Sequence, residues 1–394
     1  MHKTPLELVS TIIEKFGPRK AGSNAEKNAQ EYFSEQLKPI CNTVETEEFT
    51  DALTAKFSSL KIFCFLFYIS LALPLWSVNI AIAVSALNTV VFFFHFLMYK
   101  DWLDILYPKL TSRNVIGTIE PTGKVKQTVI ISGHMDSTPE FIWWYYFRDW
   151  GIRMMLVSGL AFVSLPIFYL SSMVFDFSPF LSYGWYCFAF CSIFSLSFFF
   201  IHGKRIVDGA QDNLSGVAVA FFAAHNLLKN GKSTLQNTRL KIISFGSEET
   251  GLKGSKAYEQ KHHDELTKAT HIINLDGMLD INEMHIIDFE LSLFARHDKY
   301  LIETLGKAFQ SNGLENKSGM IPIGATDASS FTRNGIPAVS VVGLPMHKLH
   351  PTYHTRRPPE WAQALPSEFA GSTKNPPRPS RTRPAPQKLH RRRP

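Results

Sequence analysis

The chain has 394 residues and a formal net charge of +7, but this charge is concentrated at its C-terminal end. Residues 356–394 contain ten Lys and Arg against two Asp and Glu, so the rest of the chain is close to neutral. This distribution excludes a basic, nucleic-acid-binding body, and we expect no nucleic-acid partner. The four cysteines form no CxxC pair and no Cys/His cluster, which argues against a disulfide framework or a thiolate zinc site.

The first expected element is an amphipathic helix near the N-terminus. Leu6, Val9, Ile12, Ile13 and Phe16 recur with helical spacing and define one apolar face. The segment lacks the long apolar core of a cleaved signal peptide, so we expect none.

Two apolar blocks then interrupt the chain. Uncharged runs cover residues 62–78 and 80–98 in the first block, and 154–174 and about 177–201 in the second. A bilayer-spanning helix needs about 20 apolar residues, so each run is long enough to cross, the first only just. The short separators, Val78–Asn79 and the stretch around Asp176, predict a hairpin in each block. The alternative, a pair of buried core helices, is disfavoured because such helices keep a polar face.

The flanks of these blocks indicate an orientation. Basic residues bracket the blocks at the ends that meet the rest of the chain, whereas the far turns contain no Lys or Arg; the flanking residues are Lys56, Lys61, Lys100, Lys109, Arg148, Arg153, Lys204 and Arg205. By the positive-inside rule, we expect four spans, with the bulk of the protein on the cytoplasmic side of a lipid bilayer. The run FIWWYYF at residues 141–147 is typical of an aromatic belt at the membrane interface.

The remaining sequence has the size and pattern of one α/β domain. Continuous apolar, β-branched runs predict buried strands, and runs with helical spacing predict the helices between them. The predicted strands are residues 125–133, 239–247, 271–277 and 336–343, and the predicted helices are residues 216–230 and 299–313. This alternation predicts an α/β fold with a doubly wound, mostly parallel sheet, interrupted by two transmembrane helical hairpins.

Imidazoles and carboxylates follow the ends of the predicted strands in a regular order. The stretches that carry them are SGHMDS, GAQDNLSG, SFGSEETGLKGS, NLDGM and HPTYHT, with His134, Asp136, Asp212, Glu248, Glu249, Asp276 and His354. Ligands of open α/β sheets bind beyond the carboxyl ends of the strands, and this mixture of donors suits zinc or a similar divalent ion. Each piece alone has a plainer explanation: Asp212 as a helix N-cap, Asp276 as a turn residue, and the Glu pair as the start of a helix. The ordered set is what favours a metal site.

These motifs together resemble the M28-type zinc aminopeptidases, the co-catalytic di-zinc exopeptidases. HMD, DNLSG, SEETGLKGS, NLDGM, TDASSF followed by GIPA, and YHT support the resemblance, which extends from the N-terminal helix to His354. It implies a peptidase domain at residues 1–355, with inserted transmembrane hairpins at 57–99 and 141–202. The M20 di-zinc peptidases share the ligand order, but the interval from Asp276 to His354 leaves no room for their inserted dimerisation domain.

The resemblance also implies a role for each site residue. The implied metal ligands are His134, Asp212, Glu249, Asp276 and His354, which would hold two zinc ions per chain with Asp212 as the bridge. Asp136 would orient His134, and Glu248 would be the general base. The implied substrate is a peptide.

The C-terminal end departs from the family pattern. Pro358 stands where the family usually has an Asp, and residues 356–394 are rich in Pro and Arg without helical periodicity. We expect this segment to be a disordered basic tail; a polybasic patch for anionic lipid is the functional alternative.

Three alternatives to a di-zinc aminopeptidase remain open. A glutaminyl-cyclase-like acyltransferase shares the fold and works with a single zinc. A non-catalytic membrane receptor or scaffold is less favoured because the chain keeps all five ligands and Glu248. A transporter is disfavoured because no charged residue lies in the apolar runs.

Overall fold

The structure is a computed structural model that describes residues 2–174, 178–229, 235–346 and 350–357. The chain divides into a unit of residues 1–357 and the segment 358–394. The predicted tail after Arg357 and the predicted turn at Asp176 lie outside the described residues.

The elements alternate between strands and helices, as the sequence predicts. The strands are β1 (Thr43–Asp51), β2 (Leu110–Ile119), β3 (Gln127–His134), β4 (Pro139–Phe141), β5 (His202–Ile206), β6 (Thr238–Phe245), β7 (Thr270–Asp276), β8 (His285–Glu290), β9 (Ala295–Arg296), β10 (Lys317–Ile321) and β11 (Ala338–Val342). The principal helices are α1 (Pro5–Phe16), α2 (Asn24–Leu37), α3 (Ala55–Ser58), α4 (Leu60–Ala72), α5 (Val78–Val91), α6 (Ile142–Phe147), α7 (Asp149–Val174), α8 (Ser178–Phe194), α9 (Leu196–Phe199), α10 (Ser215–Lys229), α11 (Lys253–Lys261), α12 (Lys299–Ser311) and α13 (Ala328–Thr332).

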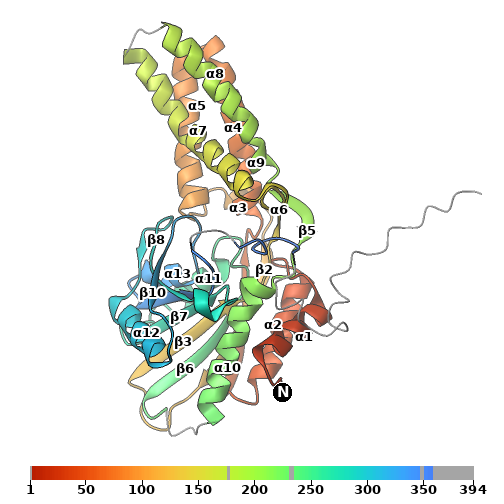
Figure 1. Cartoon of the computed structure of the whole chain (residues 1–394), viewed down its shortest axis with the longest axis vertical. Coiled ribbons are helices and arrows are strands. Elements are labelled where there is room, and N and C mark those ends of the chain that lie inside the picture. The colour runs from red at the N-terminus through yellow and green to blue at the C-terminus, as the bar shows by residue number, and fades with distance from the viewer. Residues whose placement is uncertain (1, 175–177, 230–234, 347–349, 358–394) are drawn as a thin grey trace, which may run out of the picture. The chain divides into compact units, whose positions relative to one another are not determined.

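A nine-stranded sheet forms the centre of the fold (Figure 1). Its order is β1-β2-β6-β3-β7-β11-β8-β10, with β9 on β8. The four central strands β6, β3, β7 and β11 are mutually parallel, whereas β1, β2 and β8 join their neighbours in antiparallel fashion. The predicted doubly wound, mostly parallel sheet is therefore confirmed, and antiparallel strands extend it at both sides.

Helices cover the sheet and bury its apolar side chains. Helix α10 packs on β3, β6 and β7, and α1 packs on α10. Tyr258 of α11 and Phe331 of α13 join Ile243 and Phe245 of β6 in a separate buried cluster. Because central strands buried on both faces need apolar residues throughout, this packing explains their continuous apolar runs.

Each apolar block is inserted between two strands that pair with each other. The first block leaves after β1 and returns before β2, where Asp51 pairs with Leu110. The second leaves after β4 and returns at β5, where Phe141 pairs with His202. An insertion whose two ends are already adjacent leaves the sheet order unchanged, which explains how one domain accommodates both blocks.

Among the described residues, three helical segments are long and apolar enough to cross a membrane: Ala55–Leu75, Val78–Leu97 and Asp149–Val174. The apolar helical segment Tyr183–Phe199 is shorter. The first turn differs from the predicted one, because Val78 and Asn79 already belong to α5. Ser77 caps that helix by accepting a hydrogen bond from the Ile80 N–H.

The two hairpins pack together through an aromatic core. Phe63, Phe67, Phe92, Phe162 and Phe198 lie in one buried cluster. Figure 1 shows α4, α5, α7 and α8 side by side in one bundle. Large apolar side chains point outward from the same helices, with Leu75, Trp76, Leu160 and Val174 all exposed; an outer surface of this kind is typical of a bundle surrounded by lipid.

Candidate metal centre

The parallel centre of the sheet brings the predicted site residues to one edge. His134 ends β3, Asp276 ends β7, and Glu248 and Glu249 follow β6. Asp212 lies in the kinked segment η4 (Ala210–Leu214) just before α10, where its own backbone is not helical, and His354 lies beyond β11. The carboxyl ends of parallel strands meet at one edge, so side chains far apart in sequence converge there.

Two groups of potential metal ligands form at this edge, and they share one residue. His134, Asp212 and Asp276 make the first group, and Asp212, Glu249 and His354 make the second. Within each group, one ligand atom from every residue lies within 4.8 Å of the others. All five residues predicted as ligands are therefore brought together, and Asp212 lies between the two groups.

Both imidazoles present their Nε2 atoms to Asp212. The Nε2 atom of His134 lies 3.1 Å from one carboxylate oxygen of Asp212, and the Nε2 atom of His354 lies 2.8 Å from the other. The His354 Nε2 atom is also 3.3 Å from Glu249, and that of His134 is 3.6 Å from Glu248. This places the Asp212 carboxylate between the two rings and leaves Glu248 beside the first group.

Asp136 is fully buried and holds this edge together. Its carboxylate accepts hydrogen bonds from the backbone N–H groups of Glu248 (3.0 Å) and Glu249 (3.1 Å). One of its oxygens lies 3.3 Å from His134 Nδ1, on the side of the ring away from Asp212. A single carboxylate therefore fixes both the ring of His134 and the backbone of the Glu pair.

Burial and mutual repulsion set the pKa values of the acidic residues. Burial, together with the charges of neighbouring carboxylates, raises the pKa of Glu248 and Asp276 well above the usual range and also raises that of Glu249. At Asp212, burial also acts to raise the pKa, but hydrogen bonds from the two imidazoles outweigh it and lower the pKa. Burial acts to lower the pKa of His354, yet the charges of Glu249 and Asp212 raise it to about 10.

These donors fit a divalent metal centre. Buried carboxylates are costly unless a positive charge compensates them, and this edge contains several within a few ångströms. Carboxylate oxygen and imidazole nitrogen are ordinary zinc ligands, and a carboxylate beyond a ligand imidazole is the usual way to fix its tautomer. The alternative explanation of the Glu pair as the start of a helix is wrong, since α11 begins only at Lys253.

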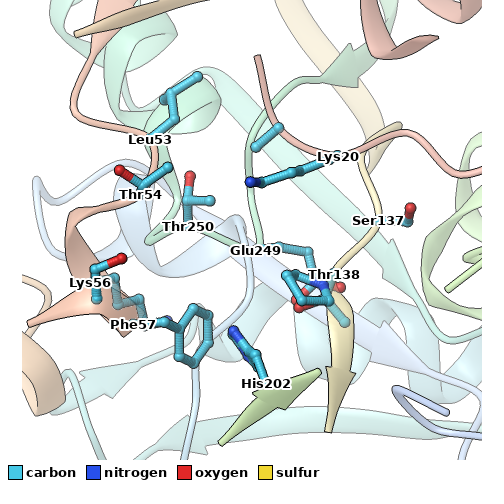
Figure 2. Close-up of a pocket in the computed structure, with 13 residues that line it drawn as sticks. Lys20, Leu53, Thr54, Lys56, Phe57, Ser137, Thr138, His202, Glu249 and Thr250 are labelled. Carbon is cyan, nitrogen blue, oxygen red and sulfur yellow. The ribbon is translucent and has the colours of Figure 1, made fainter. Parts of the chain in front are cut away.

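A pocket of about 100 Å³ adjoins this centre at Glu249 (Figure 2). Its walls come from the chain before α2, from α3 at the start of the first hairpin, and from the strands β4 and β5 that flank the second. The labelled side chains include Lys20, Lys56, Phe57 and His202. The base of the bundle thus contributes directly to the surroundings of the candidate metal centre.

Several of these neighbours give no signal in the sequence. Lys56 is there only a basic flank of an apolar block, and Lys20 and His202 lie outside the quoted motifs. Tyr353 lies within the YHT motif and stacks on His354 with ring centroids 3.9 Å apart. Burial raises the pKa of its phenol well above the usual value, and the charges of four carboxylates of the site add to this. A tyrosine adjacent to a predicted ligand was the available signal.

Comparison with known proteins gives the class of this fold. The family model for peptidase family M28 matches residues 193–359. Among curated proteins, none matches the chain significantly. The resemblance to M28-type zinc aminopeptidases inferred from the motifs is therefore confirmed at the level of a family-model match and the fold.

Three solved structures illustrate the fold. A Zn-dependent exopeptidase from Parabacteroides distasonis is 17% identical, with a TM-score of 0.51 over 89% of this chain and 88% of that chain. The zinc aminopeptidase BSAP from Bacillus subtilis is 16% identical, with a TM-score of 0.51 over 94% and 92% of the two chains. An aminopeptidase from Aneurinibacillus sp. strain AM-1 is 17% identical, with a TM-score of 0.50 over 93% and 91%. Identities this low establish a shared zinc-aminopeptidase fold and nothing finer.

Proposed function

We propose that this chain is a membrane-embedded di-zinc metallopeptidase that acts as an aminopeptidase. The observation that supports this most directly is the pair of three-residue ligand groups that share Asp212. A bridging carboxylate between two ions is the arrangement that this sharing favours. His134 and Asp276 would complete one ion's ligands, and Glu249 and His354 the other's.

Glu248 is the proposed general base. When bound, zinc ions polarise the substrate carbonyl and make water more acidic. Glu248 lies beside His134 but belongs to neither ligand group, so its carboxylate is free to accept the proton of the attacking water. It then delivers that proton to the leaving amine. Asp136 keeps Glu248 in place through the backbone hydrogen bond.

Tyr353 is the proposed hydrogen-bond donor to the developing oxyanion. Its raised pKa keeps the hydroxyl protonated at neutral pH, and its ring stacks on that of His354, one of the proposed ligands. A donor aimed at the charge that develops in the transition state typically contributes about 10²–10³-fold in turnover.

The hairpins would anchor this enzyme in a lipid bilayer with four spans and a cytoplasmic catalytic domain. The three long apolar helices and the basic flanks support this placement. In a protein without native cysteines, a cysteine introduced at Asn79 should be labelled from the side opposite to one at Lys307. Labelling of both from the same side would contradict a hairpin that crosses the bilayer.

Metal analysis combined with an aminoacyl-substrate panel tests the proposed activity. We expect about two zinc equivalents per chain and release of N-terminal residues from peptides. One equivalent, with cyclisation of N-terminal glutamine in place of peptide hydrolysis, would support the glutaminyl-cyclase-like alternative. Bound metal without turnover of either substrate class would support the receptor or scaffold.

A further inference from the structure

Two lysines that form no ion pair among the described residues line the pocket beside Glu249. Burial lowers the pKa of one of them, Lys56, to about 7, although the charges of Glu248 and Glu249 act to raise it. Lys20 lies at the end of an isolated backbone bridge to Ser137, and its side chain is exposed. Lys56 lies in α3, where its Nζ atom is 3.6 Å from the centre of the Tyr99 ring. Neither lysine forms an ion pair with any residue that the structure describes.

Two buried polar atoms in the same pocket also lack partners. The His202 Nε2 and Thr138 Oγ1 atoms are buried and form no hydrogen bond within the described part of the chain. Burial, together with the positive charges of His354, Lys20 and Lys56, lowers the pKa of His202 to about 3, so the ring stays neutral and can donate a single N–H. Such orphaned donors in a buried position cost free energy unless something binds them.

The pocket also has an apolar wall. Phe57 and Leu53 line it, and Phe57 lies 4.3 Å from the His202 ring, measured between ring centroids. Figure 2 shows Lys20 and His202 reaching toward the space from different sides, with Glu249 between them. A short aliphatic stem that ends in a charged group matches these walls and this volume.

We propose that the pocket bounded by Lys20, Lys56, His202 and Thr138 is a substrate subsite for a carboxylate, so that the enzyme prefers peptides with an anionic group close to the scissile bond. This proposal rests on the peptidase function proposed above. Glu249 is the single carboxylate among the described lining residues, and its carboxylate lies with Asp212 and His354 in the second ligand group. Lys20 therefore supplies the positive charge that faces a ligand in the pocket, and Lys56 adds to it in its protonated form. The amino and hydroxyl groups supply charge-assisted hydrogen bonds, which are about twice as strong as neutral ones.

The pocket also explains why the hairpins adjoin the site. Lys56 and Phe57 belong to the start of the first hairpin, and His202 immediately follows the second. Part of the subsite thus comes from residues at the bases of the two hairpins. Selectivity for an anionic group therefore depends on the hairpins being present in the fold.

Three matched dipeptides test the proposal and identify the source of the carboxylate. They are Glu-Ala amide, Gln-Ala amide and Gln-Ala with a free C-terminal carboxylate. Preference for the first over the second indicates a side-chain carboxylate, and preference for the third over the second indicates the peptide terminus. We expect one of these preferences to be about 10- to 100-fold in kcat/KM, the size of a charge-assisted hydrogen bond.

Lys20→Met should reduce that preference by about 10-fold, with little change for Gln-Ala amide. Lys56→Met should reduce the preference as well, but it also removes a charge that acts on Glu248 and Glu249, so turnover of Gln-Ala amide is expected to change too. Lys20 is exposed, so its substitution does not threaten the fold. Lys307→Met is the matched control, because Lys307 is an exposed lysine of α12 outside the pocket. It should leave the preference unchanged.

Binding of the same peptides to full-length, zinc-loaded Glu248→Gln protein separates this proposal from the proposed function. A binding preference that is lost in the Lys20→Met protein supports the subsite. If the unsubstituted enzyme hydrolyses no peptide, that result overturns the peptidase function but not the subsite. Turnover or binding with equal values for all three dipeptides would overturn the subsite. A preference that survives Lys20→Met would overturn it as well.

Discussion

Buried polar side chains have different partners at the candidate metal centre and in the hairpin bundle. In the bundle, they donate to backbone carbonyls: Thr89 to Phe162 O at 2.6 Å, Tyr169 to Ser70 O at 2.9 Å, and Trp185 to Leu71 O at 2.9 Å. At the sheet edge, carboxylates face each other, and Glu249 Oε1 is buried without a hydrogen bond. These three donors of the bundle are satisfied by its own backbone, although Asn88 Oδ1 and His95 Nε2 in the first hairpin are also buried without a hydrogen bond.

The donors of the bundle hold its helices together, whereas the carboxylates of the sheet edge face one another. If the bundle lies in a bilayer, as proposed, a polar side chain there needs a partner in the protein, and Thr89, Tyr169 and Trp185 find one in the backbone. A cluster of carboxylates instead stores unfavourable energy that a cation relieves. In the adjoining pocket, His202 Nε2 and Thr138 Oγ1 are buried without a hydrogen bond and line an open space that a ligand could fill.

An ionic cluster joins the two regions. Lys253, in the first turn of α11, is 3% exposed and lies within 3.0 Å of carboxylate oxygens of Asp51, Asp101 and Asp104. Asp51 precedes the first hairpin, and the other two acids follow it. The residue that follows the loop of the Glu pair therefore forms ion pairs with acids at both ends of the first apolar hairpin.

The largest expected effect is at the shared ligand. Asp212→Ala should reduce bound zinc from about two equivalents to none and abolish turnover, since a bridging carboxylate serves both ions. Metal content by mass spectrometry measures this, with exposed Asp264→Ala as the control. Loss of a single equivalent would show that Asp212 does not bridge.

The next largest effect is on stability at the ionic cluster. Lys253→Met leaves three carboxylates without their shared cation and should cost about 3–5 kcal/mol of unfolding free energy. Lys261→Met on the same helix removes a largely exposed partner of Glu47 and should cost about 1 kcal/mol or less. Denaturant unfolding in detergent compares the unfolding free energies of the two variants. Equal losses of unfolding free energy would show that the ionic cluster does not stabilise the fold.

A smaller effect is expected at the residue that orients His134. Asp136→Asn replaces one acceptor oxygen by a donor that faces a backbone N–H or His134 Nδ1. We expect zinc affinity to weaken about 10–100-fold, the usual consequence of losing such a partner. Competition with a chelator measures this, and unchanged affinity would show that Asp136 does not act through the metal ligand.

The smallest effect should come from a satisfied group of the bundle. Thr89→Val keeps the shape but removes the hydrogen bond to Phe162 O, which should cost about 0.6 kcal/mol and leave turnover unchanged. Unfolding and peptide assays on the same preparation test both expectations. A large loss of activity would show that the bundle's polar contacts affect the site.

Much of the fold follows from local sequence, because buried parallel strands require continuous apolar runs and ligands follow the strand ends. The edge strand β1 cannot be predicted in this way, because its sequence, TVETEEFTD, is charged and mostly exposed, and its pairing with β2 leaves little local pattern. The pocket cannot be predicted for a different reason. Lys20, Lys56 and His202 come from three distant segments, and only tertiary packing brings them together.

The two adjacent glutamates are proposed to have different roles: Glu248 is the general base, and Glu249 is a metal ligand. Assaying Glu248→Gln and Glu249→Gln side by side for peptide turnover and bound zinc tests this most directly. We predict that Glu248→Gln lowers turnover about 10²–10⁴-fold with full metal content. Glu249→Gln should instead lose metal, and added zinc should partly restore its activity. Near-normal turnover in the Glu248→Gln protein would contradict the account.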